Sequence, residues 1–371
     1  MATSKEIRET PFAAAHPTEI IKDEIKARGM TQNELASRMG MQKTNLSRLL
    51  KGENITPAIA ARLETALEIP ARIWLNLQAQ YEIDSRNIAA RNEDEQAAIN
   101  NEKMLSNMLN LPELYRRMHI DTASYIQDKL QQLEDLLGFP VLEIGSKGFA
   151  LQACYKKYEK FMVDEKNQTT WLALAYIESR KNRPSETFVH GNASVAARQI
   201  AAKAHQGGLT ENEIRTILDL KGISYSHVEK LDRTPIDAVS MIVDGYPSII
   251  TTHRYNDMSR LVFNILHELG HIHLHMDSAQ NSVFVSSDCT YSRDNREEKE
   301  ANKFAEDMLI PADTWKKIIS GDPKSIAKNA IVRVLKDGAV KYSLNFNIVA
   351  WRYKYESEQY GLYGTKAQPI V

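Results

Sequence analysis

Residues 263–275 read Phe-Asn-Ile-Leu-His-Glu-Leu-Gly-His-Ile-His-Leu-His, and this stretch decides the C-terminal half of the fold. The apolar run around the imidazoles predicts a helix from Leu261 to Leu274. Residues four apart share one face of a helix, so His267 and His271 present two imidazoles about one turn apart. Two such nitrogens can reach one ion at about 2.0–2.1 Å. Glu268 projects beside them and can act as a general base. The stretch therefore predicts a metal centre.

A catalytic zinc site needs a third protein ligand and an open fourth position. His273 lies two residues after His271 and points away from the metal face. His275 lies on the correct face, but eight residues from His267 is a rise of about 12 Å, too far for one ion. The third ligand must therefore come from another segment.

A second helix, predicted from about Asn295 to Leu309 after a polar loop at 276–294, offers Glu297, Glu298 and Glu300 near its start. Glu298 lies on the side of the apolar stripe that this helix buries, so we choose it as the third ligand. Glu300 and Glu297 remain alternatives. Asn302, one turn after Glu298, could accept the outer N–H of a ligating histidine and fix its tautomer.

The blocks 263–275 and 298–311, in this order, resemble the ImmA/IrrE metallopeptidase family, over roughly residues 210–315. The spacing of Glu298 and Asn302 is also similar to the Glu-x-x-x-Asp pattern of thermolysin-like enzymes. The resemblance implies Zn²⁺ and endopeptidase action, often on a repressor or partner protein in a stress or mobile-element switch. Carried onto this chain, it implies His267, His271 and Glu298 as ligands and Glu268 as the base.

Peptide hydrolysis also needs a donor that stabilises the developing oxyanion. The sequence offers several side chains near the motif without selecting one of them. These candidates are His253, Arg254, Tyr255, His275 and Tyr291.

The N-terminal part has the pattern of a helix-turn-helix. Thr31 and Glu34 have the spacing of a capping box, and Gly40 suits the left-handed turn that ends a short helix. A second helix follows over residues 42–50 and stops at Gly52. Basic side chains of this segment can neutralise phosphates, and its amides and hydroxyls can contact base edges. The candidate DNA-binding residues are Gln32, Arg38, Gln42, Lys43, Thr44, Asn45 and Arg48. The alternative is a small helical bundle with a solvated basic face.

Residues 16–84 resemble HigA-type antitoxins of the XRE family, most distinctively in the block Ile73–Tyr81. The blocks His16–Ile21 and Thr31–Ala36 carry the rest of the resemblance. It implies a homodimer on a palindromic DNA operator and pairing with a HigB-like ribonuclease toxin. Here the domain continues into a long C-terminal extension.

The chain has 371 residues, which is long enough for two or three domains. We expect a mainly α protein: an N-terminal helix-turn-helix bundle over 1–84, a helical middle region over 85–209, and a C-terminal α+β zincin-like metallopeptidase domain over 210–371. Short β-type runs at 223–228, 238–243 and 248–252 predict a small sheet in the last domain. Thr210 and Glu213 predict a capped helix before it.

The net charge is −1, so DNA binding requires a local basic patch rather than a global field. Two cysteines without a CxxC pair argue against a disulfide framework. No apolar run approaches the roughly 20 residues that span a bilayer, and residues 1–15 lack the apolar core of a signal peptide. We therefore expect a cytoplasmic protein without membrane association.

These features predict a DNA-binding transcriptional regulator with a zinc-dependent endopeptidase domain that cleaves a partner regulator or itself. The first alternative is a non-enzymatic HigA-type antitoxin or repressor whose C-terminal domain binds a toxin or senses a signal. The second is metal-dependent hydrolysis of a substrate other than protein, because the motif at His267–His271 does not identify the substrate.

Overall fold

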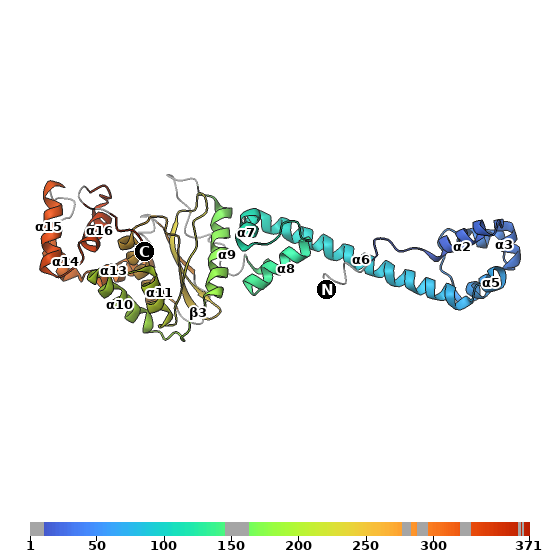
Figure 1. The fold of residues 1–371 in the computed structure, drawn as a ribbon, viewed down its shortest axis with the longest axis horizontal. Coiled ribbons are helices and arrows are strands. Elements are labelled where there is room, and N and C mark those ends of the chain that lie inside the picture. Colours follow the sequence, from blue (N-terminus) through green and yellow to red (C-terminus); the bar gives the residue numbers. More distant parts are fainter. Residues whose placement is uncertain are drawn as a thin grey trace. The chain divides into compact units, whose positions relative to one another are not determined.

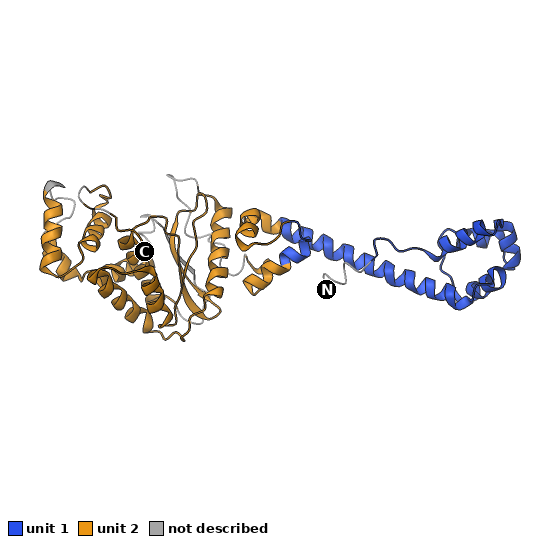
Figure 2. Cartoon of the chain, viewed as in Figure 1, with its two compact units in different colours: residues 1–103, 123–130 blue, residues 104–122, 131–371 orange. Residues whose placement is uncertain are grey.

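Figure 1 shows the computed structural model, which describes residues 11–144, 163–276, 283–287, 296–319, 328–362, 365 and 367–371. The chain divides into two compact units (Figure 2), one of residues 1–103 and 123–130 and one of residues 104–122 and 131–371. Each unit has a hydrophobic core of its own. In the described part of the chain, no helix is both long enough and apolar enough to cross a membrane.

The first unit begins with a bundle of short helices: α2 (Pro17–Ala27), α3 (Gln32–Arg38), α4 (Lys43–Leu49) and α5 (Pro57–Leu67). Thr31 and Glu34 form the predicted capping box, in which each side chain accepts the other residue's backbone N–H. Gly40 has the predicted left-handed backbone, with φ of 58°, after α3. Leu35, Leu46 and other apolar side chains of the bundle are fully buried against one another. The helix-turn-helix prediction is confirmed.

Helix α6 (Ala71–Met108) leaves this bundle and runs without interruption for 38 residues. No glycine or proline occurs within it, so nothing in the sequence breaks the backbone hydrogen bonds. Trp74 anchors its first turns: the side chain is fully buried, and Nε1 donates to the Ile69 carbonyl at 3.2 Å. The polar connector predicted after residue 84 is the second half of this helix.

The described part of the middle region is helical, as predicted, and holds α7 (Leu111–Met118), α8 (Ile126–Leu137), the 3₁₀ turn η1 (Val141–Glu143), α9 (Glu165–Lys181) and α10 (Asn192–Gln206). Trp171 of α9 is fully buried, and its Nε1 donates to the Val228 carbonyl at 3.2 Å. This contact joins α9 to the end of the first strand of the second unit.

The second unit contains a four-stranded sheet in the order β1-β3-β2-β4. Its strands are β1 (Ser224–His227), β2 (Ile236–Val243), β3 (Tyr246–Thr251) and β4 (Val283–Ser287). β1 pairs parallel to β3, while β2 pairs antiparallel to both β3 and β4. The first three strands match the three predicted runs. The prediction of a loop over 276–294 is wrong at 283–287, because β4 is a five-residue strand in a polar stretch, too short for its period to be recognised.

In Figure 1, α9 lies on one side of the sheet and the remaining helices of the second unit's C-terminal part lie on the other. These helices are α10, α11 (Glu211–Asp219), α12 (Met258–Leu274), α13 (Arg296–Leu309), α14 (Ala312–Ile318), α15 (Lys328–Lys341) and α16 (Phe346–Ser357). Thr210 and Glu213 form the predicted capping box at the start of α11. Tyr225 and Ile249 of the sheet share one core with Leu266 and Leu269 of α12. The predicted α+β architecture with a small sheet is confirmed.

Candidate functional site

Helix α12 brings His267 and His271 together inside the second unit. Asp257 caps the helix by accepting the Ser259 N–H, and the apolar face of α12 packs under the sheet. Both histidines are buried, and their Nε2 atoms lie 3.0 Å apart. Because of the four-residue spacing, the two Nε2 nitrogens point toward the same position.

Helix α13 brings Glu298 to the same point. Its two carboxylate oxygens lie 3.3 Å from the Nε2 atoms of His267 and His271, one oxygen to each ring. Ligands at about 2.0–2.1 Å from a tetrahedral zinc are roughly 3.3 Å from one another, so these separations fit such an ion. Among the described residues, these three are the one group of histidine, cysteine and acidic side chains whose ligand atoms converge in this way.

The other two carboxylates considered from the sequence lie elsewhere. Glu300 contacts His275 at 3.1 Å and Arg296 at 2.7 Å. Glu297 is exposed at the start of α13. The geometry of the described site therefore favours Glu298.

The charges of the cluster suit a cation. Burial alone would raise the pKa of Glu298, but hydrogen bonds from His267 and His271 outweigh it and lower that pKa to about 2. Burial also lowers the pKa of His271 to about 4, so this ring is neutral and keeps a lone pair. For His267, the hydrogen bond to Glu298 and the nearby carboxylate charges outweigh burial and raise the pKa. The carboxylate of Glu298 and the two imidazole nitrogens thus meet at the point where a divalent ion would sit.

Close contact between α12 and α13 sets the distance from Glu298 to the histidines. A Cβ added at Gly270 would lie 3.1 Å from Cα and 3.2 Å from the carbonyl oxygen of Ala301. A side chain at Gly270 would therefore require the backbone at Ala301 to shift by at least a few tenths of an ångström. This contact was not predicted from the sequence, although a glycine inside an apolar helix is a signal of close backbone approach.

Asn302 lies where the sequence predicted a partner for a ligating histidine. Its Oδ1 is 2.9 Å from Nδ1 of His267, the nitrogen that faces away from Glu298. The same oxygen accepts the hydroxyl of Tyr355, on α16, at 3.2 Å. Since an amide oxygen only accepts, the His267 proton belongs on Nδ1, which leaves Nε2 free to bind a metal.

Glu268 is fully buried beside the histidine pair and is hydrogen-bonded to a residue of the sheet. Ser240 of β2 donates its hydroxyl to one oxygen of Glu268 at 2.5 Å. This hydrogen bond fixes the orientation of the carboxylate. Ser240 was not among the predicted site residues, although a small polar residue inside a mostly apolar strand could have signalled it.

In the first unit, the candidate DNA-binding residues share one property: each is exposed on the surface of the helix-turn-helix. Five lie in or at the start of α4, and Gln32 and Arg38 lie at the two ends of α3. Arg48, in the last turn of α4, pairs with Glu53 at 2.6 Å while 69% of its side chain stays exposed. Glu53 is the residue directly after Gly52, and its carboxylate competes with any DNA phosphate for the Arg48 guanidinium.

Arg62 of α5 holds the turn between the two helices. Its guanidinium donates to the Gly40 carbonyl at 2.8 Å. The contact fixes the chain between α3 and α4, and therefore the angle at which α4 is presented. Arg62 was not among the residues predicted from the sequence.

Comparison with known families agrees with this geometry. Residues 227–341 match the IrrE N-terminal-like domain of the Peptidase M78 family. Residues 21–74 match the helix-turn-helix family. No curated protein matches the chain. The chain is therefore a fusion of a DNA-binding helix-turn-helix domain and a peptidase-like domain, as expected of a DNA-binding regulator. The M78 family is typically zinc-dependent, and the match includes His267, His271 and Glu298.

The HigA-like residues have structural contacts in the first unit. Gln78 accepts the Ile55 N–H at 3.0 Å, and Trp74 is a core residue of the bundle. The rings of His16 and Tyr81 pack edge to face at 4.5 Å between centroids. These contacts hold α6 and the start of α2 in place, so the resemblance reflects how the bundle packs and does not show toxin recognition.

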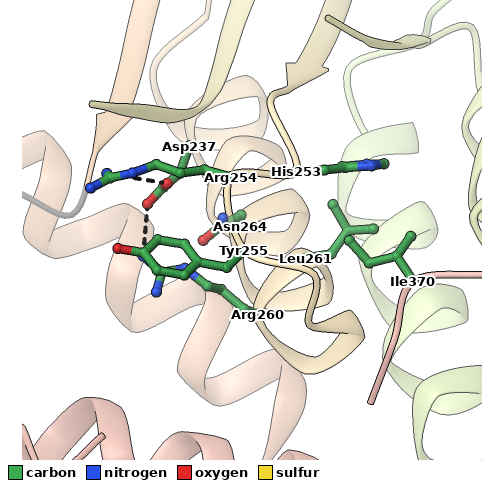
Figure 3. A pocket seen from close by; sticks show the side chains of 8 residues that line it. All are labelled: Asp237, His253, Arg254, Tyr255, Arg260, Leu261, Asn264 and Ile370. Carbon is green, nitrogen blue, oxygen red and sulfur yellow. Dashed lines mark hydrogen bonds and ion pairs between the residues drawn. The ribbon is translucent and has the colours of Figure 1, made fainter. Parts of the chain in front are cut away.

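The IrrE-like domain has a small pocket at the start of α12, which Figure 3 shows. Asp237 of β2 is buried there and contacts Arg260 at 2.9 Å and Arg254 at 3.7 Å. The Arg260 guanidinium stacks on the Tyr255 ring, 3.6 Å from its centroid. Burial, which outweighs both arginines, raises the pKa of Asp237. Arg254 and Tyr255 thus help to surround a buried carboxylate.

Two further oxyanion candidates also have local partners. His253 stacks on His227 at 3.9 Å between ring centroids and lies 3.4 Å from a Glu211 oxygen. His275 contacts His271. Tyr291 lies outside the described residues. No oxyanion donor is assigned.

Proposed function

We propose that this chain is a DNA-bound regulator whose IrrE-like domain is a zinc endopeptidase that cleaves a partner regulator or the chain itself. The observation that carries the proposal is the convergence of His267, His271 and Glu298 beside the buried carboxylate of Glu268. A purely structural packing of the two helices has no need of three ligand atoms spaced for one ion. The domain limits that go with this proposal are 1–84, 85–209 and 210–371.

In this proposal, His267, His271 and Glu298 would hold Zn²⁺, which would supply a Lewis acid for the scissile carbonyl and the attacking water. Glu268 takes a proton from the attacking water and returns it to the leaving amine, which breaks the peptide bond. Ser240 holds one oxygen of Glu268 and so orients the carboxylate for this proton transfer. Asn302 keeps the His267 proton on the nitrogen away from the ion.

The helix-turn-helix domain would bind a double-stranded DNA operator through Gln32, Arg38, Gln42, Lys43, Thr44, Asn45 and Arg48, with the chain acting as a homodimer on a palindromic site. This role places the protein in the cytoplasm with the DNA.

The test compares Glu268→Gln with the wild type. Both should carry about one zinc per chain by elemental analysis. Only the wild type should cleave itself or a candidate regulator encoded beside it, and the variant should be slower by about 10²–10⁴-fold. Glu297→Gln, the same substitution at an exposed position, is the matched control and should keep full activity.

Wild-type protein that takes up no zinc under metal-replete conditions would end the proposal. If zinc binds and Glu268→Gln leaves every regulatory response unchanged, the non-enzymatic alternative gains: a HigA-type repressor whose C-terminal domain binds a HigB-like toxin or senses a signal. If the substrate is not a protein, the wild type should show a hydrolytic activity that Glu268→Gln lacks, while the candidate protein partners remain uncleaved.

A further inference from the structure

His275, the residue at the C-terminal end of α12, lies directly behind His271 as seen from Glu298. Its Nδ1 is 3.1 Å from Nδ1 of His271, and its Nε2 is 3.1 Å from a carboxylate oxygen of Glu300. The His275 side chain is 7% exposed and the Glu300 side chain is 40% exposed, so the contacts run from the protein surface inward to His271. Glu300, His275 and His271 thus form a line of three groups joined by two hydrogen bonds.

The direction of these hydrogen bonds follows from counting protons. A carboxylate only accepts, so the proton of His275 belongs on Nε2, facing Glu300. When the His275 ring carries that one proton, its Nδ1 is an acceptor, and the hydrogen bond to His271 then requires a proton on Nδ1 of His271. That tautomer leaves Nε2 of His271 with a lone pair, which an ion between His271 and Glu298 would bind in place of the proton that otherwise joins the two side chains.

The opposite tautomer of His271 would place a proton on Nε2, where the ion should bind. Nothing within the ring prevents this form, because both tautomers of a neutral imidazole are accessible. The choice is made from outside the ring, by Glu300 acting through His275. Asn302 makes the same choice for His267 in a single step.

All three controlling groups come from one helix. Within α13, Glu298 addresses both rings, Glu300 directs His275, and Asn302 directs His267. Arg296 in turn holds Glu300 at 2.7 Å, one turn earlier on the same helix. Helix α13 therefore sets the tautomer of each histidine as well as completing the donor set.

We propose that His275 and Glu300 are positioning residues for the metal centre, which fix the tautomer and ring orientation of His271 so that it binds zinc. The proposal rests on the metal site of the proposed function but not on peptidase activity. Removing an outer partner of a ligating histidine typically lowers metal affinity by about 10–100-fold. We expect that range for loss of the His275 acceptor and a smaller decrease for loss of Glu300.

The experiment measures the zinc dissociation constant of the full chain by competition with a chromophoric chelator. His275→Leu, which has no acceptor, should bind zinc about 10–100-fold more weakly. His275→Gln, whose amide oxygen can accept the His271 proton, should recover much of the affinity. Glu300→Ala should weaken binding severalfold, and Glu297→Ala, the same change on the same helix, should leave it unchanged.

A second readout separates positioning from loss of fold. The melting temperature of the metal-free protein should be similar for wild type and variants, and cobalt absorption bands should change for His275→Leu but not for Glu297→Ala. Zinc affinity within twofold of wild type in both His275→Leu and Glu300→Ala would overturn the proposal. If His275→Leu does not fold, Glu300→Ala against Glu297→Ala decides. Tight zinc binding without peptidase activity in the wild type would instead end the proposed function and leave this inference standing.

Discussion

The DNA-facing surface and the metal centre are both built on short helical motifs, but they depend on the fold in opposite ways. The candidate DNA-binding side chains lie between residues 32 and 48, are exposed, and take their arrangement from two neighbouring helices. His267, His271 and Glu298 are largely buried and come from two helices separated by a strand. Changes at the first site should therefore act one side chain at a time, whereas changes at the second should act through helix packing as well.

The largest expected effect is the removal of the ligand that comes from the distant helix. Glu298→Ala should lower zinc affinity by more than about 100-fold, beyond the range for outer partners, because two buried imidazoles would lose the carboxylate that contacts them both. Chelator competition measures the affinity. Operator binding by the same variant, measured by fluorescence anisotropy, should be unchanged, since the helix-turn-helix residues lie in the other unit. Equal loss of both activities would contradict the independence of the two sites.

The next effect tests whether helix packing sets the metal geometry. Gly270→Val should destabilise the second unit by about 1–3 kcal/mol, since the new side chain meets the backbone of Ala301. Zinc affinity should fall with it, because Glu298 lies on the displaced helix. Urea denaturation and zinc titration measure the two changes.

Gly191→Val is the control for that experiment, because a Cβ at Gly191 meets no atom within 4 Å. It should change stability by a smaller amount and leave zinc affinity intact. If Gly270→Val binds zinc as the wild type does, the contact with Ala301 does not set the site.

At the DNA-facing surface, the effect should be smaller and confined to one contact. Arg48→Ala should weaken operator binding by about 1–3 kcal/mol if Arg48 contacts a base. If Arg48 contacts a phosphate, the slope of the logarithm of the binding constant against the logarithm of the salt concentration should become shallower by about one. Glu53→Gln should act in the opposite direction and strengthen binding by under about 1 kcal/mol, because it frees Arg48 from an exposed ion pair. Anisotropy titrations at several salt concentrations measure both. Unaltered affinity in Arg48→Ala would remove this residue from the interface.

The smallest expected effect is a pH dependence of the second unit's stability. Burial lowers the pKa of His205, whose Nε2 contacts the Leu309 carbonyl and whose Nδ1 accepts the Asn345 N–H. The unfolded chain therefore takes up a proton before the folded one does. This contribution to stability is complete above the unfolded pKa of 6.5 and is lost as the pH falls below it.

Urea midpoints of the metal-free chain between about pH 7.5 and 5 should show this loss, with a slope of at most about 1.4 kcal/mol per pH unit for one histidine. His205→Gln should reduce the slope. The seven candidate DNA-binding residues include no histidine. A slope that is unchanged in His205→Gln would assign the pH dependence to other buried histidines.

The sequence was most informative where structure follows from neighbours along the chain. The capping boxes at Thr31 and Thr210, the turn at Gly40 and the helix around His267 all depend on contacts within a few residues. The strand at 283–287 was missed because its pairing with β2 joins segments about 45 residues apart, as in Ser240 opposite Phe284. A five-residue run is too short for its hydrophobic periodicity to predict a strand or its partner.

The sequence alone was enough to predict that His267 and His271 share a helical face and that an acidic helix follows them, because helical periodicity depends only on neighbouring residues. Which carboxylate reaches the imidazoles depends on the packing of α13 against α12. The rotation of α13 about its axis, and its close approach at Gly270, turn Glu298 toward the histidines and leave Glu297 and Glu300 facing elsewhere. The hydrogen bonds that orient Glu268 and His271 likewise come from Ser240 and Glu300, which lie on other elements. Donor directions across a packed interface depend on the positions of whole helices, and no local pattern encodes those positions.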